Sequence, residues 1–244
     1  MPRFFVPASQ FEDGCVRILG DDAYHIARAL RMAAGDTLTV ADMQGGEYLC
    51  RLLSIRDTEC RLEILERRTG VSEPPIPVTL FMAYPKGDKL ETVIQKAVEL
   101  GALRIVPFFS SRCIKRPKAE DAEKLRTRLN RIATEAAKQC GRTLLPAVDS
   151  PLSYEGMLSA AGKSELPLFC YEGDGVRSLK EILTTAEVPK SISVVVGCEG
   201  GFSPAEAEAA RAAGLLPVGL GPRILRCETA PIYVLSSVSY QFEL

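Results

Sequence analysis

Three glycines and two glutamates crowd into one short segment, VVVGCEGGFSPAE, at residues 194–206. The apolar run stops at Gly197, and Ser203-Pro204 followed by Glu206 is typical of a helix start. Ligands of parallel-sheet proteins bind beyond the carboxyl ends of strands, where glycine lets a ligand lie against bare peptide groups. The segment therefore predicts a ligand site, while a tight strand-to-helix turn is the simpler alternative. Its glycine spacing fits neither a P-loop nor a dinucleotide fingerprint, which argues against a triphosphate or dinucleotide ligand.

A second segment, LGPRILRCETAP, follows another predicted strand end at residues 220–231. It places Arg223 and Arg226 in a loop, and Glu228 just before an apolar helix. Two glycine-bearing loops at the ends of neighbouring strands would close on one small molecule from both sides. Together the two segments predict a lined pocket.

Alternating strands and helices must position these loops. The apolar patterns predict strands at 78–84, 103–109, 165–171, 191–197 and 216–221. They predict helices at 88–101, at about 119–140, from 178, from 203 and after 229. The first of these helices should open with a capping box made by Asp88 and Glu91. Such alternation favours an α/β fold with a parallel sheet covered on both faces.

The first seventy residues follow a different pattern. They show one short helical stretch, DDAYHIARALRM, and strand-like pieces at 15–19, 36–42, 46–55 and 58–66. Short strands at such spacing favour a small barrel. The proline-rich segment RRTGVSEPPIPV then breaks the pattern as a linker would. We therefore expect two domains, at 1–72 and 73–244.

Composition narrows the class of protein. Hydrophobic residues make up 46% of the 244 and charged residues 25%, as in ordinary globular proteins. No apolar stretch is long enough to span a bilayer and the first residues lack a signal-peptide core, so we expect a cytoplasmic protein without a membrane partner. The eight cysteines are scattered and there is one histidine, which argues against a metal site.

The charge is unevenly distributed. The net charge is −1, but residues 111–142 hold ten Lys/Arg against four Asp/Glu. A basic segment of this kind can follow a phosphate backbone. Within it, Arg128, Arg131, Lys138 and Arg142 recur at helical spacing beside an apolar stripe of Leu125, Leu129, Ile132 and Ala136, and Arg112, Lys115 and Arg116 lie nearby. RNA is the expected partner, although a solvated helix face is the usual meaning of such a stripe.

The sequence resembles the ribosomal RNA small-subunit methyltransferase E family of the SPOUT superfamily. The resemblance rests on VGCEGGFSPAE and LGPRILRCETA, and on HIARALRMAAGD, KGDKLETVIQKAVELG, PFFSSR and EAAKQCGR in family order over nearly the whole chain. It implies a PUA-like RNA-binding barrel at 1–72 and a knotted methyltransferase domain at 73–244 whose C-terminal segment threads a trefoil knot. It also implies a homodimer, and methylation of the N3 atom of one uridine in 16S rRNA of the small ribosomal subunit.

The resemblance also implies a set of site residues. S-adenosyl-L-methionine would be the cofactor, and the adenosine would need the space that the glycines leave. The family commonly has proline where this chain has Cys198, a change that should loosen cofactor binding at most. The implied cofactor-binding residues are Gly197, Glu199, Gly200, Gly201, Leu220, Gly221, Ile224, Leu225 and Arg226. The RNA-binding candidates are His25, Arg28, Arg31, Lys86, Lys89, Arg112, Arg128, Arg131, Lys138 and Arg142.

The chemistry suggests roles for three charged residues. As uridine N3 loses its proton, negative charge spreads to the carbonyl oxygens, and an arginine would stabilise it. Arg226 is the first choice, with an ion pair to Glu199 or Glu228 as the structural alternative. Those two glutamates are the candidate proton acceptors, and the sequence does not choose between them.

Two other functions fit the same motifs. The first is ribose 2′-O-methylation, because other knotted families use similar glycine loops. The second is a non-catalytic RNA-binding factor in ribosome assembly that has kept the fold.

Overall fold

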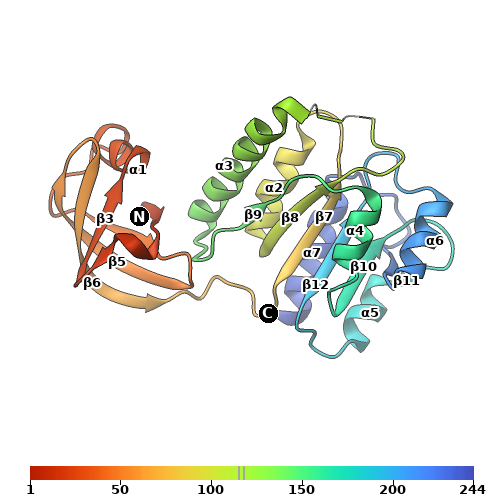
Figure 1. The fold of residues 1–244 in the computed structure, drawn as a ribbon. Coiled ribbons are helices and arrows are strands. Elements are labelled where there is room, and N and C mark those ends of the chain that lie inside the picture. The colour runs from red at the N-terminus through yellow and green to blue at the C-terminus, as the bar shows by residue number, and fades with distance from the viewer. Residues whose placement is uncertain (115, 118) are drawn as a thin grey trace. The chain divides into compact units, whose positions relative to one another are not determined.

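The computed structural model describes residues 1–114, 116–117 and 119–244. Its chain forms two compact units (Figure 1). The N-terminal unit comprises residues 1–73 and 137–145, and the C-terminal unit comprises 74–136 and 146–244. The linear division at residue 72 did not foresee the return of 137–145 to the first unit. Each unit has its own sheet.

A curled six-stranded sheet forms most of the N-terminal unit, in the order β1-β4-β5-β6-β3-β2. Its residues alternate along the strands, so that β3 buries Val16 and Ile18 between more exposed neighbours. The predicted short helix is present as α1 followed by one π-helical turn, η2. The elements are β1 (Arg3–Phe5), η1 (Ala8–Gln10), β2 (Phe11–Glu12), β3 (Cys15–Leu19), α1 (Asp21–Tyr24), η2 (His25–Ala29), β4 (Thr37–Ala41), β5 (Gly46–Ile55) and β6 (Glu59–Thr69).

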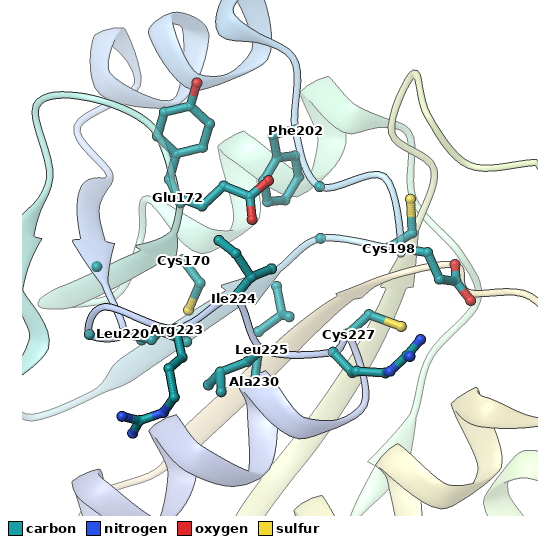
Figure 2. A pocket seen from close by; sticks show the side chains of 18 of the residues that line it. Cys170, Glu172, Cys198, Phe202, Leu220, Arg223, Ile224, Leu225, Cys227 and Ala230 are labelled. Carbon is teal, nitrogen blue, oxygen red and sulfur yellow. The ribbon is translucent and has the colours of Figure 1, made fainter.

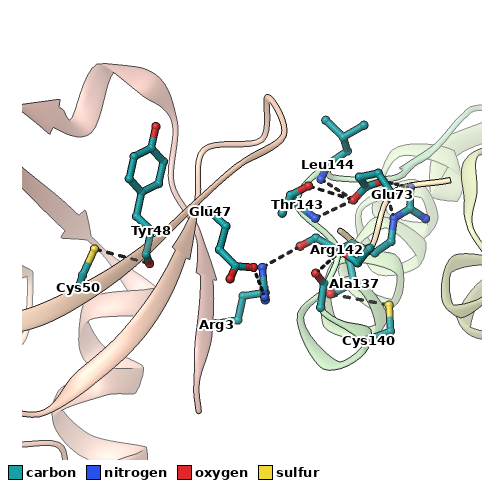
Figure 3. Close-up of polar contacts among 12 residues, drawn as sticks. Arg3, Glu47, Tyr48, Cys50, Glu73, Ala137, Cys140, Arg142, Thr143 and Leu144 are labelled. Atoms are coloured by element: carbon teal, nitrogen blue, oxygen red, sulfur yellow. Dashed lines mark hydrogen bonds and ion pairs between the residues drawn. The ribbon is translucent and has the colours of Figure 1, made fainter. Parts of the chain in front are cut away.

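A buried ion pair ties residues 137–145 to this unit (Figure 3). Arg142 is 2% exposed, and its Nη2 lies 2.7 Å from Glu73 Oε2. The Glu73 carboxylate also accepts hydrogen bonds from the amides of Thr143 (2.7 Å) and Leu144 (2.9 Å). Arg3 donates to the Arg142 carbonyl at 3.3 Å and pairs with Glu47 at 2.6 Å. The turn after α3 (Ala122–Cys140) is therefore part of the N-terminal unit.

A seven-stranded sheet forms the centre of the C-terminal unit, in the order β11-β13-β10-β12-β7-β8-β9. Every pairing in it is parallel. Strands β10 and β12 are buried at each residue, as expected for a sheet covered on both faces. Helices α2, α5 and α7 pack side by side, and α4 contacts β7 and β12 from the opposite face (Figure 1). The predicted α/β fold with a parallel sheet is confirmed, and the trefoil knot stays a prediction.

The elements of this unit follow the predicted order closely. The sequence analysis missed α4 and the short strands β9 and β11. The elements are β7 (Val78–Ala83), α2 (Lys89–Glu99), β8 (Ala102–Phe108), η3 (Ala119–Asp121), α3, β9 (Ala147–Val148), α4 (Tyr154–Ala161), β10 (Leu166–Cys170), β11 (Arg177–Ser178), α5 (Leu179–Thr185), β12 (Ile192–Val196), α6 (Pro204–Ala212), β13 (Leu216–Gly219) and α7 (Thr229–Phe242).

Two predicted helix starts have opposite outcomes. At α6 the capping box is present: Ser203 Oγ accepts the Glu206 amide, and Glu206 accepts the Ser203 amide. At α2 the predicted box is wrong, because Asp88 makes no side-chain cap and the Glu91 carboxylate pairs with Arg128 at 2.6 Å. Arg128 of α3 thus binds the Glu91 carboxylate that the sequence pattern predicted to cap α2.

Candidate functional site

Three loops meet at the carboxyl edge of the parallel sheet. Strand β10 lies between β13 and β12, so the segments that follow Cys170, Val196 and Gly219 emerge side by side. The sequence analysis anticipated two of these loops, after β12 and after β13. Their approach to each other across β10 is a consequence of strand order.

A cavity of about 580 Å³ lies between these loops, within the usual size range of small-molecule sites (Figure 2). In Figure 2 the Ile224 side chain extends between Glu172 and Phe202 on one side and Leu225 and Ala230 on the other. The lining residues are Lys89, Cys170, Tyr171, Glu172, Val176, Val196, Gly197, Cys198, Glu199, Gly201, Phe202, Gly219, Leu220, Gly221, Pro222, Arg223, Ile224, Leu225, Arg226, Cys227 and Ala230.

The first glycine loop is a tight turn. The Gly201 amide donates to the Cys198 carbonyl at 2.9 Å, and Gly201 has φ +61°. A Cβ on Gly197 would lie 3.1 Å from the Gly201 Cα, and one on Gly200 would lie 3.1 Å from the Arg112 Cβ. Both glycines are therefore closely packed against other parts of the protein, and a side chain at either position would require its neighbour to shift. Gly200 is not among the described residues that line the cavity, in contrast to its expected role as a cofactor contact.

The second glycine loop leaves open space instead. Gly221 has φ +101°, a left-handed conformation that favours glycine, and a Cβ there would meet no described atom within 4 Å. The adjacent Leu220, Ile224 and Leu225 line the cavity. The idea that glycines make room for a ligand thus fits Gly221 better than it fits Gly197 or Gly200.

Glu199 and Glu228 share one lysine. Lys89 Nζ lies 3.1 Å from Glu199 Oε1 and 3.3 Å from Glu228 Oε2. Burial alone would raise the pKa of Glu199, but hydrogen bonds from its own amide, the Lys89 ammonium and the Lys86 amide outweigh it and lower that pKa. The pKa of Glu228 is also lowered, chiefly by its own amide and by the Cys227 thiol, with Lys89 adding to the effect. Both carboxylates are therefore ionised at neutral pH.

Arg226 lines the same cavity and is exposed. Among the described residues no carboxylate forms an ion pair with it, because Glu199 and Glu228 are paired with Lys89. The ion pair considered as the structural alternative for Arg226 is thus absent from the described part of the chain. Its guanidinium can face a ligand in the cavity.

Cys198 contacts the loop after β8. Its thiol lies 3.9 Å from Ser110 Oγ, which also lies 3.3 Å from Cys113 Sγ. A hydrogen bond from the Cys198 thiol lowers the pKa of Cys113 to about 6, and the same contact raises the pKa of Cys198. Cys198 and Cys113 thus influence each other's ionisation across the contact between these two loops.

The candidate RNA-binding cations are scattered over both units, and several are engaged. In the N-terminal unit, Arg28 pairs with Asp57 at 2.7 Å and Lys138 with Asp22 at 3.1 Å. Arg142 is buried and paired with Glu73, which argues against its expected contact with an RNA phosphate. His25 is exposed, with its ring 6.4 Å from that of Phe4, and Arg31 is exposed with φ 51°.

In the C-terminal unit, some of the candidate RNA-binding cations already have a partner within the protein and others are exposed. Arg128 pairs with Glu91, and Arg112 Nη1 donates to the Gly200 carbonyl at 2.6 Å. Lys86 and Arg131 are exposed, whereas Lys89 belongs to the cavity. Arg116 is also exposed, and Lys115 lies outside the described residues.

Comparisons with known proteins find matches to both parts of the chain. A family model for an RNA methyltransferase domain matches residues 72–239, and one for an RNA methyltransferase PUA domain matches residues 18–65. Ribosomal RNA small subunit methyltransferase E of Bacillus subtilis is 35% identical over 251 residues, covering 100% of this chain and 98% of that protein. This chain belongs to the ribosomal RNA small subunit methyltransferase E family.

Two similar solved structures contain bound S-adenosylmethionine. A family member from Neisseria gonorrhoeae bound to S-adenosyl methionine is 31% identical, with a TM-score of 0.84 over 98% of this chain and 97% of that one. A methyltransferase from Legionella pneumophila in complex with SAM is 28% identical, with a TM-score of 0.87 over 98% and 96% of the two chains.

The cofactor-binding residues predicted from the sequence make up only part of the lining of the cavity. Of the predicted residues, Gly197, Glu199, Gly201, Leu220, Gly221, Ile224, Leu225 and Arg226 line it. The sequence analysis missed the whole loop after β10, with Tyr171, Glu172 and Val176. The predicted strand at 165–171 was a usable signal, because parallel strands end at one edge of the sheet. It also missed Lys89 as a cavity residue, which no local pattern announces.

Proposed function

We propose that this protein is an S-adenosylmethionine-dependent methyltransferase that modifies uridine N3 in the rRNA of the small ribosomal subunit. The cavity enclosed by three loops is the single observation that carries the proposal. It has the right size for a nucleoside ligand, and its lining combines the apolar Leu220, Ile224 and Leu225 with charged side chains. Family membership and the SAM-bound relatives support the choice of cofactor.

The chain's own residues would hold the cofactor and orient the base. Leu220, Ile224 and Leu225 offer apolar contact, and the left-handed Gly221 leaves peptide groups accessible. When bound, S-adenosylmethionine supplies an electrophilic methyl group. The task left to the protein is to hold uridine N3 in line, exclude water and help the N3 proton depart.

Arg226 has the chemistry to stabilise the charge that develops on the uracil oxygens. Glu199 and Glu228 are ionised, which is the state that a proton acceptor needs, although their lowered pKa values make each a weak base. We therefore propose that Arg226 contributes more to the rate of methyl transfer than either glutamate does. We retain the two glutamates as the candidate proton acceptors.

The partner proposals follow from the same family. We propose rRNA, alone or in the small subunit, as the substrate, and hence a cytoplasmic location.

We also propose a homodimer, supported by a groove of about 700 Å³ between α5 and α7 and by Tyr233 and Tyr240, which are 42% and 76% exposed beside it. Sedimentation equilibrium of the full chain tests the dimer. Among the described residues no group of ligating side chains suits a metal ion, and no helix is long and apolar enough to cross a membrane.

Methyl transfer tests the function directly. The full chain is incubated with isotope-labelled S-adenosylmethionine and either small subunits or naked rRNA that lack the modification, and the RNA is digested to nucleosides for mass spectrometry. We expect labelled 3-methyluridine. A labelled 2′-O-methyl nucleoside would identify the ribose as the target instead. No incorporation, together with no calorimetric heat on adding the cofactor, would indicate a non-catalytic assembly factor.

A further inference from the structure

Lys89 bridges two loops that are far apart in the sequence. It is the first residue of α2, and its ammonium lies 3.1 Å from Glu199 in the loop after β12 and 3.3 Å from Glu228 in the loop after β13. The Cys227 thiol lies 3.9 Å from the same ammonium. Glu199 is held a second time from the same segment, because the Lys86 amide donates to its Oε1 at 3.1 Å.

The position of this lysine is electrostatically unusual. The first turn of a helix favours acids, because the unsatisfied amides carry partial positive charge. A lysine at that place is unfavourable for α2 itself. Two carboxylates on neighbouring loops would in turn repel each other without a cation between them. The Lys89 ammonium offsets that repulsion. Lys89 therefore stabilises the arrangement of the two loops rather than helix α2.

We propose that Lys89 is a positioning residue that clamps the loops of Glu199 and Glu228 together and so keeps the cofactor cavity formed. This inference rests on the proposed function, and it replaces the expected role of Lys89 as an RNA contact. The side chains are 32%, 29% and 30% exposed, so each pair alone is modest. The effect comes from both pairs sharing one cation.

The clamp predicts how cofactor affinity responds to pH. The groups around Lys89 are Glu199, Glu228 and Cys227, and burial raises the pKa of Cys227 to about 12, so that thiol stays neutral. In Lys89→Met the two carboxylates face each other, and protonation of one relieves the repulsion. The affinity of that variant should improve as the pH falls from about 7 to about 5, whereas that of the parent protein should not.

Calorimetry with S-adenosylmethionine is the main test. We expect Lys89→Met to raise the dissociation constant about tenfold, and Lys89→Arg to recover most of the loss because it restores the cation. Hydrogen exchange should be faster at residues 198–201 and 226–229 in Lys89→Met. The matched control is Lys96→Met on the same helix, since Lys96 pairs with Glu99 within α2 and should change neither measurement.

A double variant separates the clamp from a general loss of folding. Lys89→Met combined with Glu199→Gln removes the repulsion and should recover part of the cofactor affinity. The proposal is overturned if Lys89→Met binds the cofactor like the parent, or if Lys89→Arg is as weak as Lys89→Met. If Lys89→Met binds RNA more weakly but binds the cofactor with unchanged affinity, Lys89 is an RNA contact and the proposal is overturned. If the parent protein itself shows no cofactor binding, the proposed function fails, which is a distinct result.

Discussion

Charged residues around the cavity divide into a paired group and an unpaired one. Lys89 pairs with both Glu199 and Glu228, so its single positive charge is committed to these two carboxylates. Arg226 lines the same space without a carboxylate partner among the described residues. A cation free to meet a developing negative charge is worth more to the transition state than one already paired.

Replacement of Arg226 by alanine should affect turnover much more than cofactor binding. We expect kcat to fall by about a hundredfold or more and the dissociation constant of the cofactor to change by less than about threefold. Single-turnover methylation and calorimetry measure the two quantities. Arg104→Ala is the control, because Arg104 is an exposed arginine that pairs with Asp149 and is not among the described residues that line the cavity. Equal losses of turnover and affinity would assign Arg226 to cofactor binding alone.

Among the elements, the end of α3 shows how a helix can be fixed by a partner outside its own segment. The turn at 141–145 returns to residues 70–73, where Glu73 holds Arg142 and two backbone amides. Ser72 Oγ also donates to the Gly141 carbonyl at 2.6 Å. Burial would raise the pKa of Glu73, but Arg142 and these amides lower it. The carboxylate therefore stabilises the fold in its ionised form.

Substitution of Glu73 by glutamine should destabilise the protein markedly. It removes the negative charge that pairs with the buried Arg142, and loss of one charge of such a buried pair costs about 3 kcal/mol. Because the pKa of Glu73 is lowered in the folded state, its contribution is present above the unfolded-state pKa and is lost as the pH falls through the folded-state value. The difference between parent and variant, measured by urea unfolding, should thus shrink in acid. Glu66→Gln, at an exposed pair with Arg68, should change little, and an equal effect there would contradict the assignment.

For the whole molecule, the question is which basic residues remain for RNA. The net charge is −1, and the excess within residues 111–142 is partly consumed by Glu91, Asp22 and Glu73. Arg128 keeps a side chain that is 55% exposed, and Arg131 is exposed one helical turn further along α3. These two are the strongest remaining candidates on that helix.

Charge reversal at Arg128 and Arg131 should weaken RNA binding and reduce its salt dependence. Loss of two phosphate contacts should lower the slope of log affinity against log salt by about two. Filter binding at several salt concentrations measures the slope. Lys163→Glu with Lys190→Glu is the control, since both lysines are exposed next to the amino ends of β10 and β12, at the edge of the sheet opposite the cavity. An unchanged slope in the Arg128 and Arg131 variant would exclude this helix face from the RNA site.

The sequence by itself determined most of the elements, though not α4, β9 or β11, and it determined the helix cap at Ser203, because such features depend on residues a few positions apart. It also placed the two glycine loops and the family. Only the tertiary structure decided that β10 lies between β13 and β12, which adds the Glu172 loop to the site. The same holds for the partners of Lys89, Glu91 and Arg142. Each of these charges has several possible counter-ions in the sequence, and strand order and packing select one of them in space.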